Sequence, residues 1–257
     1  MFPHAGLLFP LAMSSFTVIV PALNEEENLR PAVEAILKEI GPRARFLEVL
    51  VFDDASTDRT GEIADELSRQ DARVCVFHNP QRLNIGGIYK AGIKEARGDY
   101  VLWVPGDNET RLDEIAKGLE YLDGADIVVF YVTNDEVRAW PRRVLSRLYV
   151  RIVNLLFGTR FRYTNSMNIF RTNVVRRVPI VTNGFAYQTE ALVKAVRSGV
   201  DFVQVGIKIK ARDSGTSKAL TWKNFVAVAV ALGRLWWDLK VKERHRYRRS
   251  GRLLGVF

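Results

Sequence analysis

The first half of the chain alternates short apolar runs with segments in which apolar residues recur every three or four positions. A short apolar run predicts a buried strand, and the longer period predicts an amphipathic helix. Strands that alternate with helices are typical of a mainly parallel sheet with helices on both faces, so we predict an α/β fold. Predicted strands cover residues 16–20, 48–52, 74–77, 100–104 and 127–130, and predicted helices cover 25–40, 59–69, 86–96 and 112–122.

The second half of the chain has a different pattern. No Asp or Glu occurs from residue 137 to 189, whereas ten arginines do. An amphipathic helical pattern covers about 219–243 and includes Trp222, Trp236 and Trp237. We therefore predict an apolar extension at 1–15, one large α/β domain at 16–215, and an amphipathic helix at 216–257 with a basic tail at 240–252.

No segment of the sequence predicts a membrane crossing or a signal peptide. The closest candidate for a crossing, 225–235, is shorter than the roughly 18 residues required and is interrupted by Arg234. The first 13 residues are apolar but lack the basic start of a signal peptide. The single cysteine, Cys75, excludes an internal disulfide framework and is typical of a reducing compartment. We therefore predict a cytoplasmic location.

The net charge of +9 indicates a polyanionic partner, such as phosphates, anionic lipid or nucleic acid. Nucleic acid is the least favoured of the three. The sequence contains no recognised nucleic-acid motif, and its basic residues lack the interleaved aromatic side chains of a stacking platform.

Acidic side chains follow the ends of at least three predicted strands, in the segments 21–25, 53–60 and 105–109. The carboxyl ends of parallel strands meet at one edge of a sheet, where ligands of such folds bind. Clustered carboxylates repel one another, and a divalent cation that bridges a diphosphate would offset this repulsion. Two local alternatives remain: Ser56 and Asp58 could cap the second helix, and Gly86 could either ease a turn or admit a diphosphate.

Four segments together resemble the family 2 glycosyltransferases of the GT-A fold. They are VIVPALNEEENL (18–29), VLVFDDASTDRTGEIA (49–64), NIGGIYKAGIKEARGDYVLWVPGD (84–107) and GFAYQTEALVKAVRSG (184–199). Within that family, RAWPRRVLSRLY (138–149) and RDSGTSK (212–218) are most similar to the polyprenyl-phosphate sugar synthases of the dolichyl-phosphate mannose synthase type.

This resemblance implies a nucleotide-sugar donor and a divalent metal, Mg²⁺ or Mn²⁺. The family has a D-x-D motif after its fourth strand, but this chain has Pro105-Gly106-Asp107, so the first aspartate is absent. The resemblance implies that Asp107 is a metal ligand and catalytic residue, and that Glu109 is a second ligand. The residues implied to contact the donor are Pro21, Leu23, Asn24, Glu25, Asp53 or Asp54, Asn84, Gly86 and Asp107.

The resemblance also implies an inverting transfer to a polyprenyl phosphate, such as dolichyl or undecaprenyl phosphate. A phosphate monoester has a second pKa of about 6, so it is mostly a dianion at neutral pH and needs no general base. The guanidinium group suits the task of holding it. The candidates are Arg138, Arg142 and Arg143, together with Ser146.

Two other functions remain open. A soluble family 2 transferase acting on a glycan or small-molecule hydroxyl would need a carboxylate base, for which Glu190 is the candidate. A non-catalytic nucleotide-binding protein would also explain the absent aspartate. The C-terminal helix and basic tail suggest a peripheral protein on an anionic membrane surface at the cytoplasmic face, although such a helix could instead pack on the domain.

Overall fold

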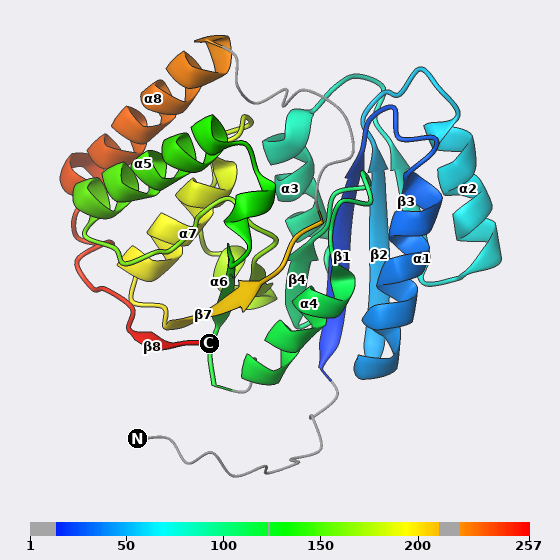
Figure 1. The fold of residues 1–257 in the computed structure, drawn as a ribbon, viewed down its shortest axis with the longest axis horizontal. Coiled ribbons are helices and arrows are strands. Elements are labelled where there is room, and N and C mark those ends of the chain that lie inside the picture. The colour runs from blue at the N-terminus through cyan, green and yellow to red at the C-terminus, as the bar shows by residue number, and fades with distance from the viewer. Residues whose placement is uncertain (1–13, 123, 211–221) are drawn as a thin grey trace.

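The computed structural model describes residues 14–122, 124–210 and 222–257. Within them, an eight-stranded sheet runs through the centre of the molecule in the order β3-β2-β1-β4-β6-β5-β7-β8 (Figure 1). All neighbouring strands are parallel except β6, which is antiparallel to both β4 and β5. The strands are β1 (Ser15–Ala22), β2 (Phe46–Asp53), β3 (Val74–His78), β4 (Tyr100–Trp103), β5 (Ile127–Val132), β6 (Ile169–Arg171), β7 (Phe202–Ile207) and β8 (Leu253–Val256).

Helices cover both faces of the sheet, as predicted. Alternate residues of β1 belong to different apolar clusters: Val18 and Val20 pack with one set of helices, and Ile19 packs with the other. The first set is α1 (Leu29–Glu39), α2 (Thr60–Gln70) and α4 (Leu112–Ala116). The second set is α3 (Asn84–Glu95), α5 (Trp140–Phe157), α6 (Thr172–Val175), α7 (Tyr187–Arg197) and α8 (Trp222–Trp237).

The five predicted strands and the first three predicted helices are confirmed, with ends that shift by a few residues. The fourth predicted helix is divided into α4 and a 3-10 helix at Lys117–Tyr121. Gly118 lies in this 3-10 segment, where a Cβ atom would overlap the ring of Phe130. Two further 3-10 helices occupy Gly41–Arg43 and Asp135–Val137.

The C-terminal residues are more ordered than the predicted helix and basic tail. After α8 the chain makes a π-helical turn at Asp238–Lys242, and its last residues form β8, which pairs with β7. Arg252 in this region forms a salt bridge with Asp201 at 2.8 Å. The basic segment is therefore partly docked on the domain, and the predicted boundary at residue 215 stays a prediction. Segments 1–13 and 212–218 lie outside the described residues.

Candidate active site

The loops that follow β1, β2 and β4 are joined by backbone hydrogen bonds at the carboxyl edge of the sheet. The N–H of Asp54 donates to the carbonyl of Ala22 at 2.9 Å, and the N–H of Gly106 donates to the carbonyl of Pro21 at 3.0 Å. Leu23, the next predicted donor-binding residue, is half-buried in the first of these loops. The parallel arrangement therefore brings together three of the segments singled out from the sequence.

Side-chain hydrogen bonds also connect the loops after β1 and β2. The N–H of Asn24 donates to Ser56 Oγ at 3.0 Å, and Asn24 Oδ1 accepts the N–H of Thr57 at 2.9 Å. The N–H of Glu25 donates to the hydroxyl of Thr60 at 2.7 Å. Asp58 accepts the N–H of Thr60 at the start of α2 and the N–H of Glu26 in the loop after β1. Ser56 and Asp58 thus connect two loops, which is more than capping the second helix.

Backbone strain gathers at the same edge. Among the described residues, four that are not glycine have a left-handed backbone, with φ angles of 53–60°. Each follows a different strand, β1, β2, β3 or β4, and Asn84 is also the first residue of α3. Residues held in this region of backbone space cost free energy and cluster at functional sites. The four are Asn24, Ala55, Asn84 and Asn108. Asparagine tolerates this conformation, so its recurrence after three of the four strands is a signal in the sequence that could have identified Asn108, which was not among the predicted site residues.

Asp53 and Asp54 are both buried, but their carboxylates form hydrogen bonds with different partners. Asp53 accepts the N–H of Ser56 at 3.0 Å, and its other oxygen lies 3.2 Å from His78 Nδ1. His78 Nε2 lies 3.0 Å from Asp65. Hydrogen bonds to Asp65 and then to Asp53 raise the pKa of His78 above its ordinary value, against the opposing effect of burial. His78 was not among the residues predicted from the sequence, because its two carboxylate partners are distant along the chain.

Asp54 holds the amino end of α3. Its Oδ1 accepts the N–H of Leu83 at 2.7 Å and the side-chain amide of Asn79 at 3.0 Å. Its Oδ2 accepts the N–H of Asn84 at 3.1 Å. A carboxylate at this position satisfies N–H groups that would otherwise be available to an anion at a helix amino terminus. A contact between Asp54 or Asn84 and the donor stays a prediction.

Gly86 packs against a distant segment of chain. Its N–H donates to the carbonyl of Asn183 at 3.0 Å, and a Cβ atom on it would overlap the carbonyl oxygen of Thr182. The absence of a side chain at this position is therefore explained by a close approach of two backbones. That Gly86 also contacts the donor stays a prediction.

The two predicted metal ligands occupy one tight turn after β4. Asp107 is half-buried, Glu109 is exposed, and Lys210 Nζ donates to the carbonyl of Asn108 between them at 3.0 Å. Among the described residues, no group of three or more His, Cys, Asp or Glu side chains is arranged to hold a metal ion. The carboxylates of Asp107 and Glu109 are hard oxygen ligands, and two of them fit an open site in which substrate oxygens complete the coordination of a hard cation.

The predicted acceptor arginines lie beyond β5, which is parallel to β7 and ends at the same edge as β1. The guanidinium group of Arg138 lies over the ring of Tyr163 and donates to its hydroxyl at 3.2 Å. Arg142, Arg143 and Ser146 are half-buried in the first two turns of α5. All four candidates therefore lie between the carboxyl end of β5 and the second turn of α5.

Glu190 is placed differently from the exposed base that a hydroxyl acceptor would need. Its side chain is only 6% exposed and forms a 2.7 Å salt bridge with Lys194. Its carboxylate also accepts the N–H groups of Val181 and Thr182. Burial acts to raise the pKa of Glu190, but the hydrogen bond and charge of Lys194, together with hydrogen bonding from Thr182, outweigh it and hold the pKa below its ordinary value. These contacts make Glu190 an anchor for the preceding loop, and its role as a base stays a prediction.

Comparison with known proteins adds to this geometry. The model of the family described as Glycosyl transferase family 2 matches residues 17–182. The chain is 32% identical to a polyprenol monophosphomannose synthase of Mycolicibacterium smegmatis, over 78% of this chain and 79% of that protein. It is 30% identical to an undecaprenyl-phosphate mannosyltransferase of Micrococcus luteus, over 78% of this chain and 85% of that protein.

Solved structures share the architecture at lower sequence identity. Glucosyl-3-phosphoglycerate synthase from Mycobacterium tuberculosis, in complex with Mn²⁺, uridine diphosphate and phosphoglyceric acid, superimposes with a TM-score of 0.65. The two sequences are 18% identical, and the match covers 88% of this chain and 78% of that one. This likeness shows that the fold is the GT-A fold.

Proposed function

Because the chain belongs to glycosyl transferase family 2, we propose that it moves a sugar from a nucleoside diphosphate to a polyprenyl phosphate at a membrane surface. Similar proteins are named as transferases of mannose to polyprenol or undecaprenyl phosphate, which supports this class of acceptor. The observation that carries the proposal is a pair of neighbouring helices, α5 and α8, that expose apolar side chains, the first of which also carries Arg142 and Arg143.

Helix α5 combines an exposed apolar face with arginines. Its exposed apolar residues recur at the spacing of one helical face, and Trp140 and Leu155 near its two ends are 68% and 85% exposed. Arg143, Arg147 and Arg151 repeat at the same four-residue spacing alongside. Long basic side chains beside an apolar face are typical of a helix lying in the interface of an anionic membrane. The exposed apolar residues are Trp140, Val144, Leu148, Ile152, Leu155 and Leu156.

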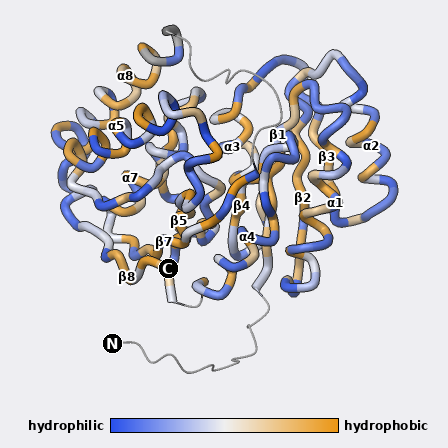
Figure 2. The backbone as a smooth tube through the Cα atoms, viewed as in Figure 1, coloured by the Kyte–Doolittle hydropathy of each residue, from blue (hydrophilic) through white to orange (hydrophobic). Residues whose placement is uncertain are grey.

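Helix α8 lies beside α5 (Figure 1), and apolar residues recur along it (Figure 2). Leu232 and Leu235 on one side are buried in the protein core. The other side exposes Val230, at 66%, and Trp237, at 55%. An exposed apolar surface of this kind on a single chain marks a site of protein or membrane contact. Among the described residues, none of the helices has the length and apolar character needed to cross a bilayer. We infer peripheral binding at the cytoplasmic face.

In the proposed reaction, an oxygen of the acceptor phosphate attacks the anomeric carbon of the donor sugar. A new carbon–oxygen bond to the acceptor forms as the bond to the diphosphate breaks, and the nucleoside diphosphate leaves with the electron pair. Attack opposite the leaving group inverts the anomeric centre. Arg142 and Arg143 would hold and orient the acceptor dianion, and no residue needs to remove a proton from it.

Asp107, with Glu109, would hold Mg²⁺ or Mn²⁺ against the donor diphosphate. A bound divalent ion would supply neutralisation of the negative charge that develops on the leaving group. The loops after β1 and β2, fastened by Asn24 and Ser56, would form the walls around the nucleoside. Their many hydrogen bonds favour a preformed site, which reduces the entropy lost on binding.

The direct test is a transfer assay with GDP-, UDP- and dTDP-linked hexoses, Mn²⁺ or Mg²⁺, and two acceptors: a short-chain polyprenyl phosphate and a glycan with free hydroxyls. We expect one donor to give a sugar-linked lipid phosphate, and we expect EDTA to stop its formation. Transfer to the glycan but not to the lipid phosphate would contradict the proposal in favour of the hydroxyl acceptor. Donor binding without transfer to either acceptor would favour a non-catalytic nucleotide-binding protein.

A further inference from the structure

Lys194 of α7 is a buried cation that the proposed reaction does not use directly. Its side chain is 2% exposed. Its Nζ lies 2.7 Å from Glu190 Oε1 and 3.7 Å from Asp238 Oδ2, and it donates to the carbonyl of Pro179 at 2.8 Å. A buried ammonium group is unfavourable unless charges and hydrogen bonds compensate it. These compensating groups come from α7, from the loop before α7 and from the turn after α8.

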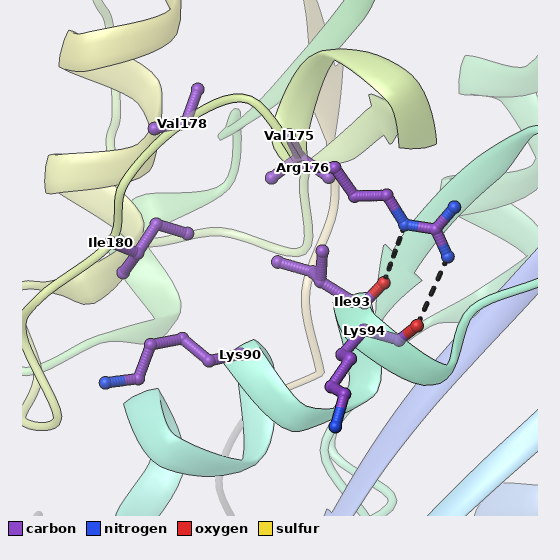
Figure 3. A pocket seen from close by; sticks show the side chains of 7 residues that line it. All are labelled: Lys90, Ile93, Lys94, Val175, Arg176, Val178 and Ile180. Carbon is purple, nitrogen blue, oxygen red and sulfur yellow. Dashed lines mark hydrogen bonds between the residues drawn. The ribbon is translucent and has the colours of Figure 1, made fainter.

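The loop before α7, residues 176–183, is a strap that runs along α3. At its start, the guanidinium group of Arg176 donates to the carbonyl oxygens of Ile93 and Lys94 at the end of α3, at 3.1 and 3.3 Å (Figure 3). Toward its end, the N–H groups of Val181 and Thr182 donate to Glu190 at 3.1 and 2.9 Å. The strap is therefore fixed both to α3 and to the Glu190–Lys194 pair.

The far end of the strap determines the environment of the amino end of α3. Asn183 accepts the N–H of Gly86 through its backbone carbonyl at 3.0 Å, and its side-chain oxygen accepts Lys90 Nζ at 2.5 Å. A Cβ on Gly86 would overlap the backbone of the strap, so the two backbones are in close contact. The same end of α3 carries Asn84, which Asp54 binds at the carboxyl edge of the sheet. A shift of the strap would therefore move α3 relative to the predicted donor site.

Asp238 extends this connection to the C-terminal helix. It is the first residue of the π-helical turn that follows α8, and its side chain is 13% exposed. Because α8 also exposes Val230 and Trp237, the buried ion cluster lies between the proposed membrane surface and the strap. A group that contacts two elements at once can transmit a change in one to the other.

We propose that Lys194 is a positioning residue for sugar transfer, which fixes the 176–183 strap against the amino end of α3 and ties it through Asp238 to the C-terminal helix. The inference rests on the proposed function, because it takes that end of α3 as part of the donor site. It assigns Glu190 a different role from that of a catalytic base. Glu190 is the link through which Lys194 acts on Val181 and Thr182.

The test compares three variants of the full chain. Lys194→Met keeps the length of the side chain and removes its charge. Lys194→Met leaves two buried carboxylates without their cation. Asp238→Asn, which keeps the Glu190–Lys194 pair, is therefore measured beside it. Glu48→Gln is the matched control. Glu48 is also a buried carboxylate in an ion pair, with Arg97 at 2.6 Å, but it lies near the amino end of β2, away from the carboxyl edge of the sheet.

Two measurements need no turnover: the Kd for UDP, GDP or dTDP with Mn²⁺ by calorimetry, and amide hydrogen exchange of the unliganded chain. We expect Lys194→Met to raise the Kd about tenfold, within the range of typical coupling between sites, and Asp238→Asn to raise it less, about threefold. Exchange should accelerate at Val181, Thr182 and Gly86. In Glu48→Gln, the Kd should stay within about twofold at a similar loss of Tm.

An unchanged Kd in Lys194→Met, with a loss of Tm like that of the control, would overturn the positioning role and leave only a structural one. Faster exchange and weaker binding in Lys194→Met but not in Asp238→Asn would overturn the connection to the C-terminal helix. A wild-type chain that binds a nucleoside diphosphate but transfers no sugar contradicts the proposed function alone. The nucleotide Kd and the hydrogen exchange still test the role of Lys194, because neither depends on sugar transfer. A wild-type chain that binds none of UDP, GDP and dTDP overturns both.

Discussion

The backbone N–H of Glu109 donates a 3.1 Å hydrogen bond to Oδ1 of Asp107. The two residues proposed as metal ligands therefore form one hydrogen-bonded turn. The turn is helped by Asn108 between them, whose φ of 53° asparagine tolerates well. This geometry separates the effect of charge at Asp107 from its effect on the loop, because an asparagine side chain can accept the same hydrogen bond.

Asp107→Asn should reduce kcat by on the order of 100-fold or more, because it removes a negative ligand while keeping the turn. Its Tm should stay close to that of the wild type. Asp113→Asn is the control, since Asp113 is an exposed carboxylate nearby that pairs with Arg111. Steady-state transfer and thermal unfolding measure both effects. Wild-type turnover that persists in excess EDTA would contradict the assignment of Asp107 as a ligand of a catalytic metal ion.

Glu109→Gln should raise the metal concentration needed for half-maximal rate about fivefold, since an exposed carboxylate near a divalent ion contributes roughly 1 kcal/mol. The maximal rate at saturating metal should change little. The measurement is a titration of transfer rate with Mn²⁺. An unchanged half-maximal concentration would mean that Glu109 has no part in metal binding.

Arg142→Ala and Arg143→Ala should each cost about 2–4 kcal/mol of transition-state stabilisation, because a charge-assisted contact to the acceptor phosphate is lost. Arg151→Ala, further along the same helix, should cost far less. The values come from kcat/KM for a short-chain polyprenyl phosphate.

Glu190→Gln should retain most of kcat at saturating donor, because a phosphate dianion needs no base. The opposite ranking, with kcat lost in Glu190→Gln and kept in both arginine variants, would refute the lipid-phosphate acceptor. It would establish Glu190 as the base for a hydroxyl acceptor.

Leu155→Ser and Val230→Ser should weaken binding to vesicles that contain anionic lipid, because each removes an exposed apolar side chain from the α5 or α8 surface. Each loss should amount to roughly 1–2 kcal/mol. Phe46→Ser is the matched control, because Phe46 is also exposed but lies at the start of β2. Co-sedimentation at constant salt gives the affinities. Equal effects in all three variants would argue against a defined docking face.

His78→Gln should destabilise the protein more at acidic than at basic pH. The pKa of His78 is raised in the folded chain, so its stabilisation is fully present below its ordinary pKa of about 6.5. That contribution is lost as the pH rises through the higher folded value. The measurement is the Tm difference between wild type and variant from pH 5.5 to 8.5. A difference that grows with pH would mean that neutral His78 is the stabilising form.

The sequence by itself determined the alternation of strands and helices, and it located acidic loops at the ends of β1, β2 and β4. This was possible because apolar periodicity reports local structure, and because parallel strands direct their carboxyl ends to one edge. The helical pattern of the C-terminal segment was equally local. The same pattern could not distinguish a face that packs on the core from a face that stays exposed, and α8 has both.

Tertiary structure decided what each acidic residue contacts. Asp54 binds Asn84, and Lys194 lies 3.7 Å from Asp238, which is 44 residues further along the chain than Lys194. Such contacts depend on how helices settle on the sheet, and no local pattern encodes them. The reversed strand β6 and the final strand β8 were likewise set by pairing with strands distant along the chain, since a three- or four-residue strand carries little periodicity of its own.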